Sequence, residues 1–322
     1  MLINILKCHG SGNDFILIDE WSNAYNFSEE QRVILSQTLC DRKSSLGSDG
    51  ILFFTKSDKV DAGMRMFNTD GSEAEMCGNG LRCLARYALE LLKKDKALIE
   101  TLKENLEVEK IPDIFQGVKT FKVAIKPVRF QLETLPMIFP KETLRNEKIQ
   151  GLSEELLFTA LSIPNPHIVT IVDTIDEKAI EEIGIKANLD KNIFPRGVNL
   201  NFVKPLGENI IYVQTYERGV GLTNACGTGM SSASLVSCLL GINKIDSVIT
   251  VVNRGGMVKC QPKVDKLGNY SVELMGNATY TFQGEVEFNY DYPLDFVYTN
   301  EKDYLEDINN YNKLAEYAKD TL

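Results

Sequence analysis

The chain has 322 residues, 43% of them hydrophobic, which is enough to bury one large core or two ordinary ones. Its net charge of -10 leaves no basic stripe for nucleic acid, so a small molecule is the expected partner. The chain begins without a signal-peptide pattern and has no run of about 18 apolar residues, which predicts a cytoplasmic protein without a membrane partner. The two histidines and seven widely spaced cysteines predict neither a metal site nor disulfides.

Hydrophobic periodicity along the chain predicts a mixed structure. Alternating or continuous apolar runs predict strands over 2–7, 14–19, 50–54, 63–67, 119–125, 128–132, 167–173, 198–203, 209–216, 248–252, 257–261, 270–274 and 279–288. Apolar residues at helical spacing predict helices over 28–40, 79–94, 152–161, 176–186, 228–240 and 301–319. Ser28 followed by Gln31 has the spacing of a capping box at the first helix. The class expected is α+β.

Three segments of the first half recur in the same order in the second half. Residues 12–19 resemble 164–173, residues 47–54 resemble 197–203, and the segment 76–80 resembles 225–229. The offsets are nearly equal, at 152 residues between Asn13 and Asn165 and 149 between Cys77 and Cys226. Such a repeat predicts two homologous lobes.

The repeat sets the expected domain organisation. We predict an N-terminal lobe of 1–126 with 278–288, a C-terminal lobe of 127–277, and a largely helical extension over 289–322. A pseudo-twofold relation between the lobes would place the two Cys-Gly-x-Gly segments on opposite sides of a cleft. A ligand is expected to bind in that cleft.

Cys77 and Cys226 each precede a predicted helix, and this position suggests their chemistry. Free N–H groups and the positive end of the helix dipole favour anions, which predicts that both thiol pKa values are lowered toward neutrality. The same amides could hold a substrate carboxylate. Two opposed thiols could invert an amino-acid α-carbon, one removing a proton while the other delivers one, with the amides carrying the negative charge. No cofactor and no metal are expected.

The segments that carry these cysteines resemble a known family. The resemblance covers residues 1–288 and rests on 7–15, 65–72, 76–83, 165–167, 216–219, 225–229, 254–256 and 284–285. These motifs are similar to those of the diaminopimelate epimerase family. The resemblance implies a fold of two pseudo-symmetric α/β lobes, with Cys77 and Cys226 as the acid-base thiols. The implied activity interconverts LL- and meso-diaminopimelate, in lysine and peptidoglycan precursor biosynthesis, without a cofactor.

The resemblance also implies which residues bind an amino-acid substrate. The reacting carboxylate would be held at the two helix starts, by Gly78, Asn79, Gly227 and Thr228, with Asn13 nearby. The distal amino-acid head would be held by Asn68, Asn199, Glu217 and Arg218. This agrees with chemistry, because a guanidinium pairs with a carboxylate and a carboxylate pairs with an ammonium group. The pocket would be lined by Asn165 and His167, although a turn histidine bonded to the backbone is an equal interpretation of His167.

One departure from the family pattern leaves alternatives open. Leu222 stands where many members of the family have an acidic residue, so a racemase of another amino acid, such as histidine, is a second hypothesis. A third, from another class, is a thiol redox or ligand-binding protein whose cysteines form a switchable disulfide. The extension from 289 exceeds the usual family length. A homodimer is a candidate assembly.

Overall fold

The computed structural model describes residues 1–321, which form two compact units. The first unit contains Met1–Val123 and Gly276–Leu314, and the second contains Ala124–Met275 and the chain from Ala315 onward. The extension predicted from 289 is therefore divided, because most of it belongs to the first unit. Each unit is a layered α/β structure of paired strands and helices.

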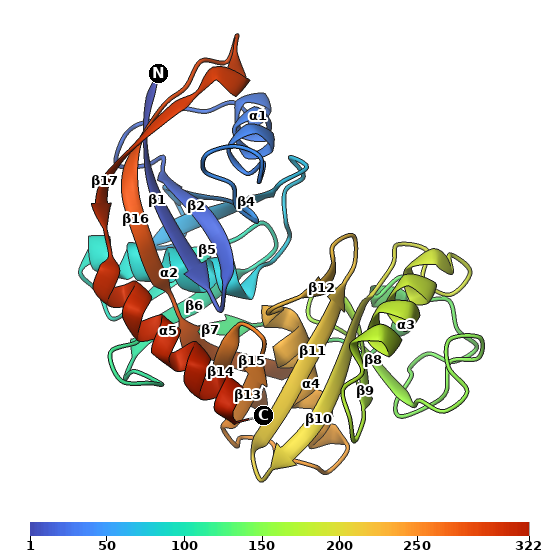
Figure 1. Ribbon diagram of the computed structural model, residues 1–322. Coiled ribbons are helices and arrows are strands. Elements are labelled where there is room, and N and C mark those ends of the chain that lie inside the picture. Colours follow the sequence, from blue (N-terminus) through green and yellow to red (C-terminus); the bar gives the residue numbers. More distant parts are fainter. Residues whose placement is uncertain (322) are drawn as a thin grey trace. The chain divides into compact units, whose positions relative to one another are not determined.

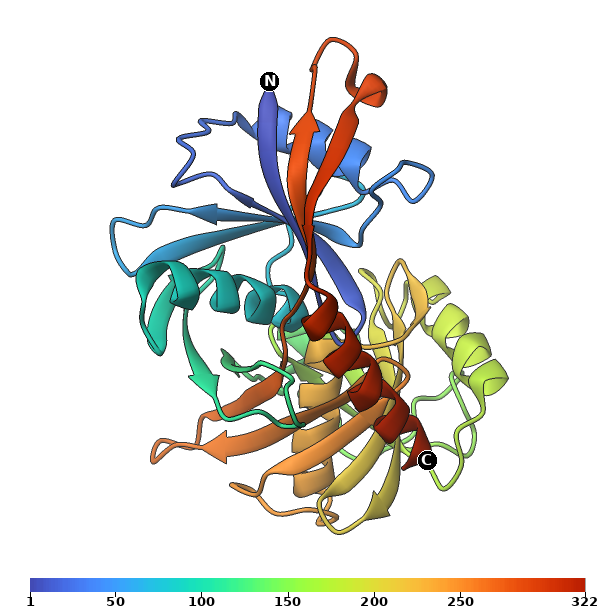
Figure 2. The same cartoon turned by 60° about the vertical axis from the view of Figure 1, so that its left-hand side comes forward.

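The first unit is built on one mixed sheet (Figure 1). Its strands are β1 (Leu2–Gly10), β2 (Asn13–Asp19), β3 (Gly50–Thr55), β4 (Ala62–Asn68), β5 (Lys96–Glu100), β6 (Asn105–Ile111), β7 (Thr120–Ile125), β16 (Thr279–Glu287) and β17 (Val297–Asp303). They are paired in the order β17-β16-β1-β2-β3-β4-β5-β6-β7. The β2–β3 and β4–β5 pairs are parallel and the others are antiparallel. Figure 2 shows β16 and β17, in orange and red, beside the blue first strand.

Helices α1 (Glu29–Leu39) and α2 (Gly78–Leu92) cover opposite faces of this sheet. Successive side chains of a strand point to opposite faces, so neighbouring residues contact different helices. In β3, Phe53 lies in the core cluster that includes residues of α1, whereas the ring of Phe54 meets Tyr87 of α2 at 5.3 Å. The capping box predicted at α1 is confirmed, with Ser28 and Gln31 bonding each other's backbone N–H groups. Helix α2 contacts β1 to β6, so the sheet wraps around it.

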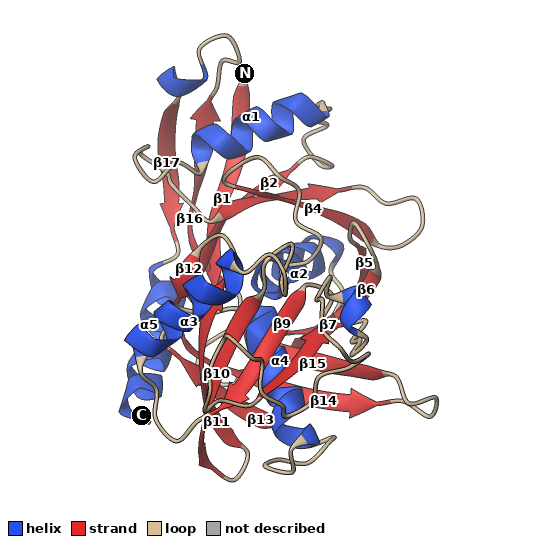
Figure 3. Cartoon of the chain, turned by 90° about the vertical axis from the view of Figure 1, so that its right-hand side faces the viewer, coloured by secondary structure: helices blue, strands red, loops and turns tan. Residues whose placement is uncertain are grey.

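The second unit repeats this arrangement. Its strands are β8 (Phe158–Ser162), β9 (Pro166–Ile171), β10 (Asn199–Gly207), β11 (Ile210–Glu217), β12 (Gly221–Thr223), β13 (Ile249–Asn253), β14 (Gly256–Val264) and β15 (Tyr270–Asn277), with helices α3 (Glu177–Leu189) and α4 (Gly227–Leu239). The order is β8-β9-β10-β11-β13-β14-β15, with β12 beside the end of β11. The parallel pairs are β9–β10, whose connection contains α3, and β11–β13, whose connection contains α4. Helix α4 packs on β9, β10, β11, β13 and β14 (Figure 3). The predicted repeat is therefore present in the topology.

Two predicted elements are wrong. The segment 152–161 does not form a helix, because Phe158–Ser162 is a fully buried strand paired with β9, and sheet pairing overrides the helical spacing of its leucines. The segment 128–132 is not a strand. Only Arg129 makes an isolated bridge there, and Leu132 begins the short 3-10 helix η1 (Leu132–Thr134) and enters the core.

The C-terminal extension differs from its prediction as well. It contains the short 3-10 helix η2 (Pro293–Asp295) and strand β17 before helix α5 (Leu305–Asp320). The helix predicted from 301 begins at Leu305, because Lys302 and Asp303 pair with β16. The extension was predicted to run to residue 322, which lies outside the described residues. No helix within residues 1–321 is long and apolar enough to cross a membrane.

Candidate active site

Both predicted catalytic cysteines are N-cap residues, and their local geometry is the same. Cys77 caps α2, and its sulfur accepts a hydrogen bond from the Gly80 N–H at 3.4 Å. Cys226 caps α4, and its sulfur accepts one from the Gly229 N–H at 3.3 Å. The expected position at helix N-termini is confirmed for each cysteine. Cys77 is half-buried, whereas Cys226 is only 5% exposed.

The second glycine of each Cys-Gly-x-Gly segment lets the helix start lie close to a strand. A Cβ at Gly229 would lie 2.4 Å from the Oδ1 of Asn201 on β10. A Cβ at Gly80 would lie 2.9 Å from the side chain of Leu52 on β3. Since real Cβ atoms do not approach other atoms so closely, a larger residue at either glycine would force the neighbouring side chain to move.

In the first unit, Asn13 links the start of β2 to the start of α2. Its Oδ1 accepts a hydrogen bond from the side-chain amide of Asn79 at 3.2 Å and lies 3.9 Å from the Cys77 sulfur. Its own amide donates to Asp49 at 2.6 Å, a residue that precedes β3. Asn13 is therefore held from two sides, with its carbonyl oxygen facing the thiol.

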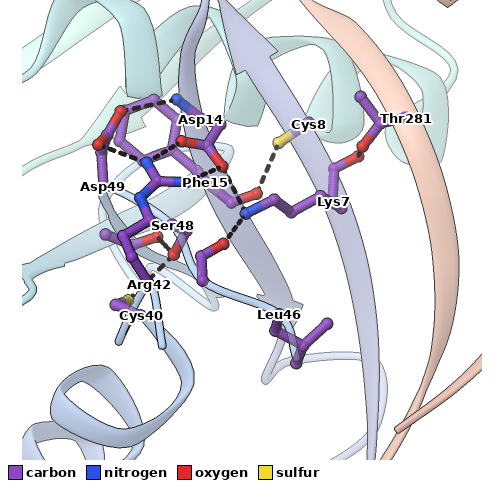
Figure 4. Close-up of polar contacts among 12 residues, drawn as sticks. Lys7, Cys8, Asp14, Phe15, Cys40, Arg42, Leu46, Ser48, Asp49 and Thr281 are labelled. Carbon is purple, nitrogen blue, oxygen red and sulfur yellow. Dashed lines mark hydrogen bonds and ion pairs between the residues drawn. The ribbon is translucent and has the colours of Figure 1, made fainter. Parts of the chain in front are cut away.

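Asp14, the residue after Asn13, belongs to a charged cluster with Asp49, Arg42 and Lys7 (Figure 4). Arg42 donates to both Asp14 and Asp49, and Lys7 pairs with Asp14 and donates to the Gly47 carbonyl. Burial favours the neutral form of Asp14, but the hydrogen bonds and charges of Arg42 and Lys7 outweigh it and lower the pKa of Asp14. The cluster fixes the loop that carries Asp49 against β1 and β2.

In the second unit, His167 at the start of β9 is the centre of a buried polar network. It is fully buried, and its Nδ1 accepts a hydrogen bond from Asn201 at 3.0 Å. Its Nε2 lies 3.1 Å from both the Asn165 Oδ1 and the Thr228 Oγ1. Burial and the charge of Arg218 lower the pKa of His167 to about 3, so the ring is neutral at pH 7. With Nδ1 accepting, the single proton sits on Nε2.

This network directs the hydroxyl of Thr228 toward Cys226. The hydroxyl oxygen has the His167 Nε2 at 3.1 Å and the amide of Asn165 at 3.2 Å, both as donors. A hydroxyl has two acceptor sites and one proton, so the remaining proton is free to point at the Cys226 sulfur, 3.5 Å away. Thr228 is therefore a donor to this sulfur, as is the backbone N–H of Gly229.

The predicted lowering of the thiol pKa is wrong for Cys226. Burial raises its pKa well above the ordinary value, and the carboxylate of Glu217 raises it further. The bonds from Thr228 and Gly229 lower the pKa but do not outweigh burial. The helix N-terminus favours the thiolate, but desolvation of a sulfur that is almost wholly enclosed has the larger effect. In this state Cys226 is a thiol at neutral pH, and therefore a proton donor.

The other predicted substrate-binding residues lie at or directly after the ends of helices and strands. Gly78 and Gly227 are the first residues of α2 and α4 and are buried. Asn68, at the end of β4, bonds the Ser72 hydroxyl at 3.0 Å. Asn199 accepts from the Arg218 N–H at 2.9 Å, and the exposed Arg218 side chain donates to the carbonyl of Arg196. The predicted residues thus form two groups, with Asn13, Asn68, Cys77, Gly78 and Asn79 in the first unit and Asn165, His167, Asn199, Glu217, Arg218, Cys226, Gly227 and Thr228 in the second.

Two residues of these networks were missed from sequence, although signals for both existed. Asn201 is two positions after Asn199 on β10 and so shares its face. It bonds the ring of His167 and accepts from the Thr215 hydroxyl at 2.9 Å. Asp49 stands 150 residues before Asn199, at the same place in the repeat, and holds Asn13. Within residues 1–321 no group of three or more His, Cys, Asp or Glu side chains could hold a metal ion.

Solved structures place this fold in a class. A phenazine biosynthesis protein of Bacillus anthracis has a TM-score of 0.66 at 16% identity, covering 89% of this chain and 100% of that one. A hydroxyproline epimerase of Agrobacterium vitis has a TM-score of 0.59 at 14% identity, covering 98% of each chain. At these identities the likeness concerns the fold alone, which is the epimerase-like fold of two repeated α/β units.

Sequence comparison is more specific. A model of the diaminopimelate epimerase family matches residues 5–118 and 159–281. A diaminopimelate epimerase of Clostridium acetobutylicum is 50% identical over 317 residues, which covers 98% of this chain and 95% of that protein. One of Listeria monocytogenes is 46% identical over 281 residues, covering 85% of each. The chain belongs to the diaminopimelate epimerase family.

Proposed function

We propose that this protein is an isomerase that interconverts LL- and meso-diaminopimelate by proton transfer between its α-carbon and the sulfurs of Cys77 and Cys226. Membership of the diaminopimelate epimerase family supports the activity. The observation that supports the two-cysteine mechanism is the matched placement of both thiols as N-caps, each bonded to the second glycine of its segment. The step belongs to lysine and peptidoglycan precursor biosynthesis, and needs no cofactor.

The protons and bonds in this mechanism balance. The Cα–H bond breaks and its proton passes to one sulfur as thiolate, while the S–H bond of the other breaks and its proton goes to the opposite face of Cα. In the ligand-free state Cys226 holds its proton, because of burial and Glu217, and is ready to act as the acid. Cys77 is then the base for that direction. After one turnover the roles are exchanged, and solvent resets them.

The helix starts supply the stabilisation that a cofactor would otherwise give. Backbone amides of Gly78, Asn79, Gly227 and Thr228 would bind the carboxylate and carry charge as the carbanion develops. Asn13, Asn165 and His167 would line the pocket. The distal amino-acid head would be held by Asn68, Asn199, Glu217 and Arg218.

Leu222 does not favour a different amino acid. Its side chain packs against the hydrophobic core of the second unit, beside Tyr216, so it has a structural role of its own. The neighbouring Thr223 donates to the Glu217 carboxylate at 2.6 Å, which keeps an acidic group in this segment. The departure that suggested a histidine racemase therefore has an explanation in packing.

The proposal is tested with purified, reduced protein in deuterated water. LL-diaminopimelate is expected to be converted to the meso form with uptake of deuterium at the α-carbon, whereas a panel of single amino acids, histidine included, is expected to keep its optical rotation. Cys77→Ser and Cys226→Ser are expected to abolish turnover. Cys238→Ser, which changes a half-buried thiol elsewhere on α4, is the matched control. Turnover of a single amino acid instead of diaminopimelate would contradict the substrate, and ligand binding without any turnover would favour the redox or binding alternative.

The cellular place and the assembly are part of the same proposal. We expect the protein in the cytoplasm, where its biosynthetic substrate is found, and as a homodimer. Size-exclusion chromatography with light scattering tests the assembly, and a monomeric mass at working concentration would contradict the dimer.

A further inference from the structure

The first part of helix α5, Leu305–Leu314, belongs to the first unit but lies outside the residues that the family model matches. It is nevertheless well packed, since Tyr311 and Leu314 are buried. Its contacts reach the end of β1, which leads into the turn before Asn13, and α2, which Cys77 caps.

The first contact is between Tyr311 and His9, at the end of β1. The two ring centroids are 4.3 Å apart in an edge-to-face arrangement. Burial lowers the pKa of His9 to about 4, so its ring is neutral at pH 7. The His9 Nδ1 accepts a hydrogen bond from the Gly12 N–H at 3.3 Å. Tyr311 therefore buttresses a ring that holds the turn directly before Asn13.

That turn needs such support. Ser11 and Gly12 both have positive φ, at 56° and 80°, and for Ser11 this left-handed conformation is unfavourable. The Ser11 N–H donates to Asn277 at 2.8 Å, and the Ser11 hydroxyl accepts from Arg82 of α2 at 3.0 Å. The next residue is Asn13, whose carbonyl oxygen faces Cys77.

The second contact joins α5 to α2 itself. Asp307 forms an ion pair with Arg86, whose side chain is 2% exposed. Arg86 also donates to the Ala278 carbonyl at 2.7 Å and lies over the ring of Tyr280 at 3.5 Å. Arg86 also pairs with Glu90 of α2 at 3.0 Å, so loss of Asp307 leaves Arg86 with a carboxylate partner but removes the ion pair that joins α5 to the helix that Cys77 caps.

We propose that Tyr311 and Asp307 of the C-terminal helix are positioning residues for the Cys77 half of the active site, acting through the His9-supported turn and through α2. This inference rests on the proposed function. Neither residue touches the reacting atoms. Proton transfer is sensitive to small displacements, with a 1 Å misplacement costing on the order of 100-fold in rate, so loosening either contact slows the reaction more than it weakens binding.

The test compares three variants, Tyr311→Leu, Tyr311→Phe and Asp307→Asn, with the control Tyr317→Leu. Tyr317 lies on the same helix and is 53% exposed. The turnover number and KM for diaminopimelate are measured with the free energy of unfolding. Tyr311→Leu and Asp307→Asn are expected to lower kcat about tenfold with KM within about twofold of the wild type. Tyr311→Phe keeps the ring against His9 and is expected to retain at least about half of kcat, and Tyr317→Leu to match the wild type.

A second measurement does not depend on turnover. The alkylation rate of Cys77 in ligand-free protein, followed by peptide mass spectrometry, is expected to change about threefold or more in Tyr311→Leu and not in Tyr317→Leu. If the wild type turns over diaminopimelate and all variants match it in kcat and in Cys77 alkylation, the inference is overturned while the proposed function stands. If the wild type shows no turnover, the proposed function fails, and the alkylation rates alone decide whether α5 positions Cys77. Equal losses in Tyr311→Phe and Tyr311→Leu would overturn the role of the ring.

Discussion

The hydroxyl of Thr228 is the group through which the buried network of the second unit reaches Cys226. Thr228→Val keeps the shape of the side chain and removes only that hydroxyl. Three contacts are lost, at 3.1 Å to His167, 3.2 Å to Asn165 and 3.5 Å to the Cys226 sulfur. The change therefore isolates the polar contribution of one atom.

The magnitude follows from what is left unpaired. The His167 Nε2 proton can still be accepted by the Asn165 Oδ1 at 3.1 Å, so the ring is not orphaned. The amide of Asn165 loses its acceptor, and a half-buried donor left unsatisfied costs about 1–3 kcal/mol. We expect the free energy of unfolding to fall by about 1–2 kcal/mol. The Thr228 bond lowers the pKa of Cys226, so its loss raises that pKa further and is expected to slow the direction in which Cys226 is the base.

Urea unfolding monitored by circular dichroism gives the stability change, and α-hydrogen exchange in each direction gives the kinetic one. Thr228→Ser keeps the hydroxyl and is the matched control, expected to fall between the wild type and Thr228→Val in stability and to retain most of its exchange rate. If Thr228→Val is as stable and as active as the wild type, the hydrogen-bond assignment around Thr228 is incorrect. A Thr228→Ser variant as impaired as Thr228→Val would show that the methyl group matters, not the hydroxyl.

Two further predictions concern ionisation. Burial lowers the pKa of His9 to about 4 and that of His167 to about 3. Below pH 6.5 the unfolded chain binds protons that the two buried rings do not, so the free energy of unfolding falls as the pH falls. The loss is up to about 1.4 kcal/mol per pH unit for each ring. Unfolding free energies at pH 7.5 and 5.0 check this, and equal values would contradict it. Glu217→Gln removes a charge that raises the pKa of Cys226, so alkylation of Cys226 in ligand-free protein is expected to begin at lower pH. Glu208→Gln, at an exposed position of the same unit, is the control and should leave the alkylation profile unchanged.

Much of the architecture could be predicted because it depends on local and repeated signals. The Cys-Gly-x-Gly segments at Cys77 and Cys226 indicated helix starts that pack closely against a strand. Both helices do begin at the residue after the cysteine. The offset between the two halves is reproduced as the same order of strand pairing in each unit. Ser28 and Gln31 gave the start of α1 because a capping box is a contact within four residues.

What could not be predicted depends on neighbours distant in sequence. The segment 152–161 has leucines at helical spacing, and only the pairing of its end with β9 makes Phe158–Ser162 a strand. The pKa of Cys226 depends on how completely the sulfur is enclosed and on Glu217, nine residues before it, neither of which a helix-end argument contains. The helix of the extension was expected, but nothing in its sequence indicated that Tyr311 would lie against His9.

The proposed mechanism has two thiols, one from each repeat, acting on opposite faces of one carbon. It is tested most directly by stopping the wild-type reaction in deuterated water after a few per cent of LL-diaminopimelate has been converted. We expect the meso product to carry one solvent deuterium at the inverted carbon and the recovered LL substrate to carry almost none, because the acid that delivers the proton is not the base that removes it. Equal deuterium in substrate and product from the earliest times, or product formed with the original hydrogen, would contradict it.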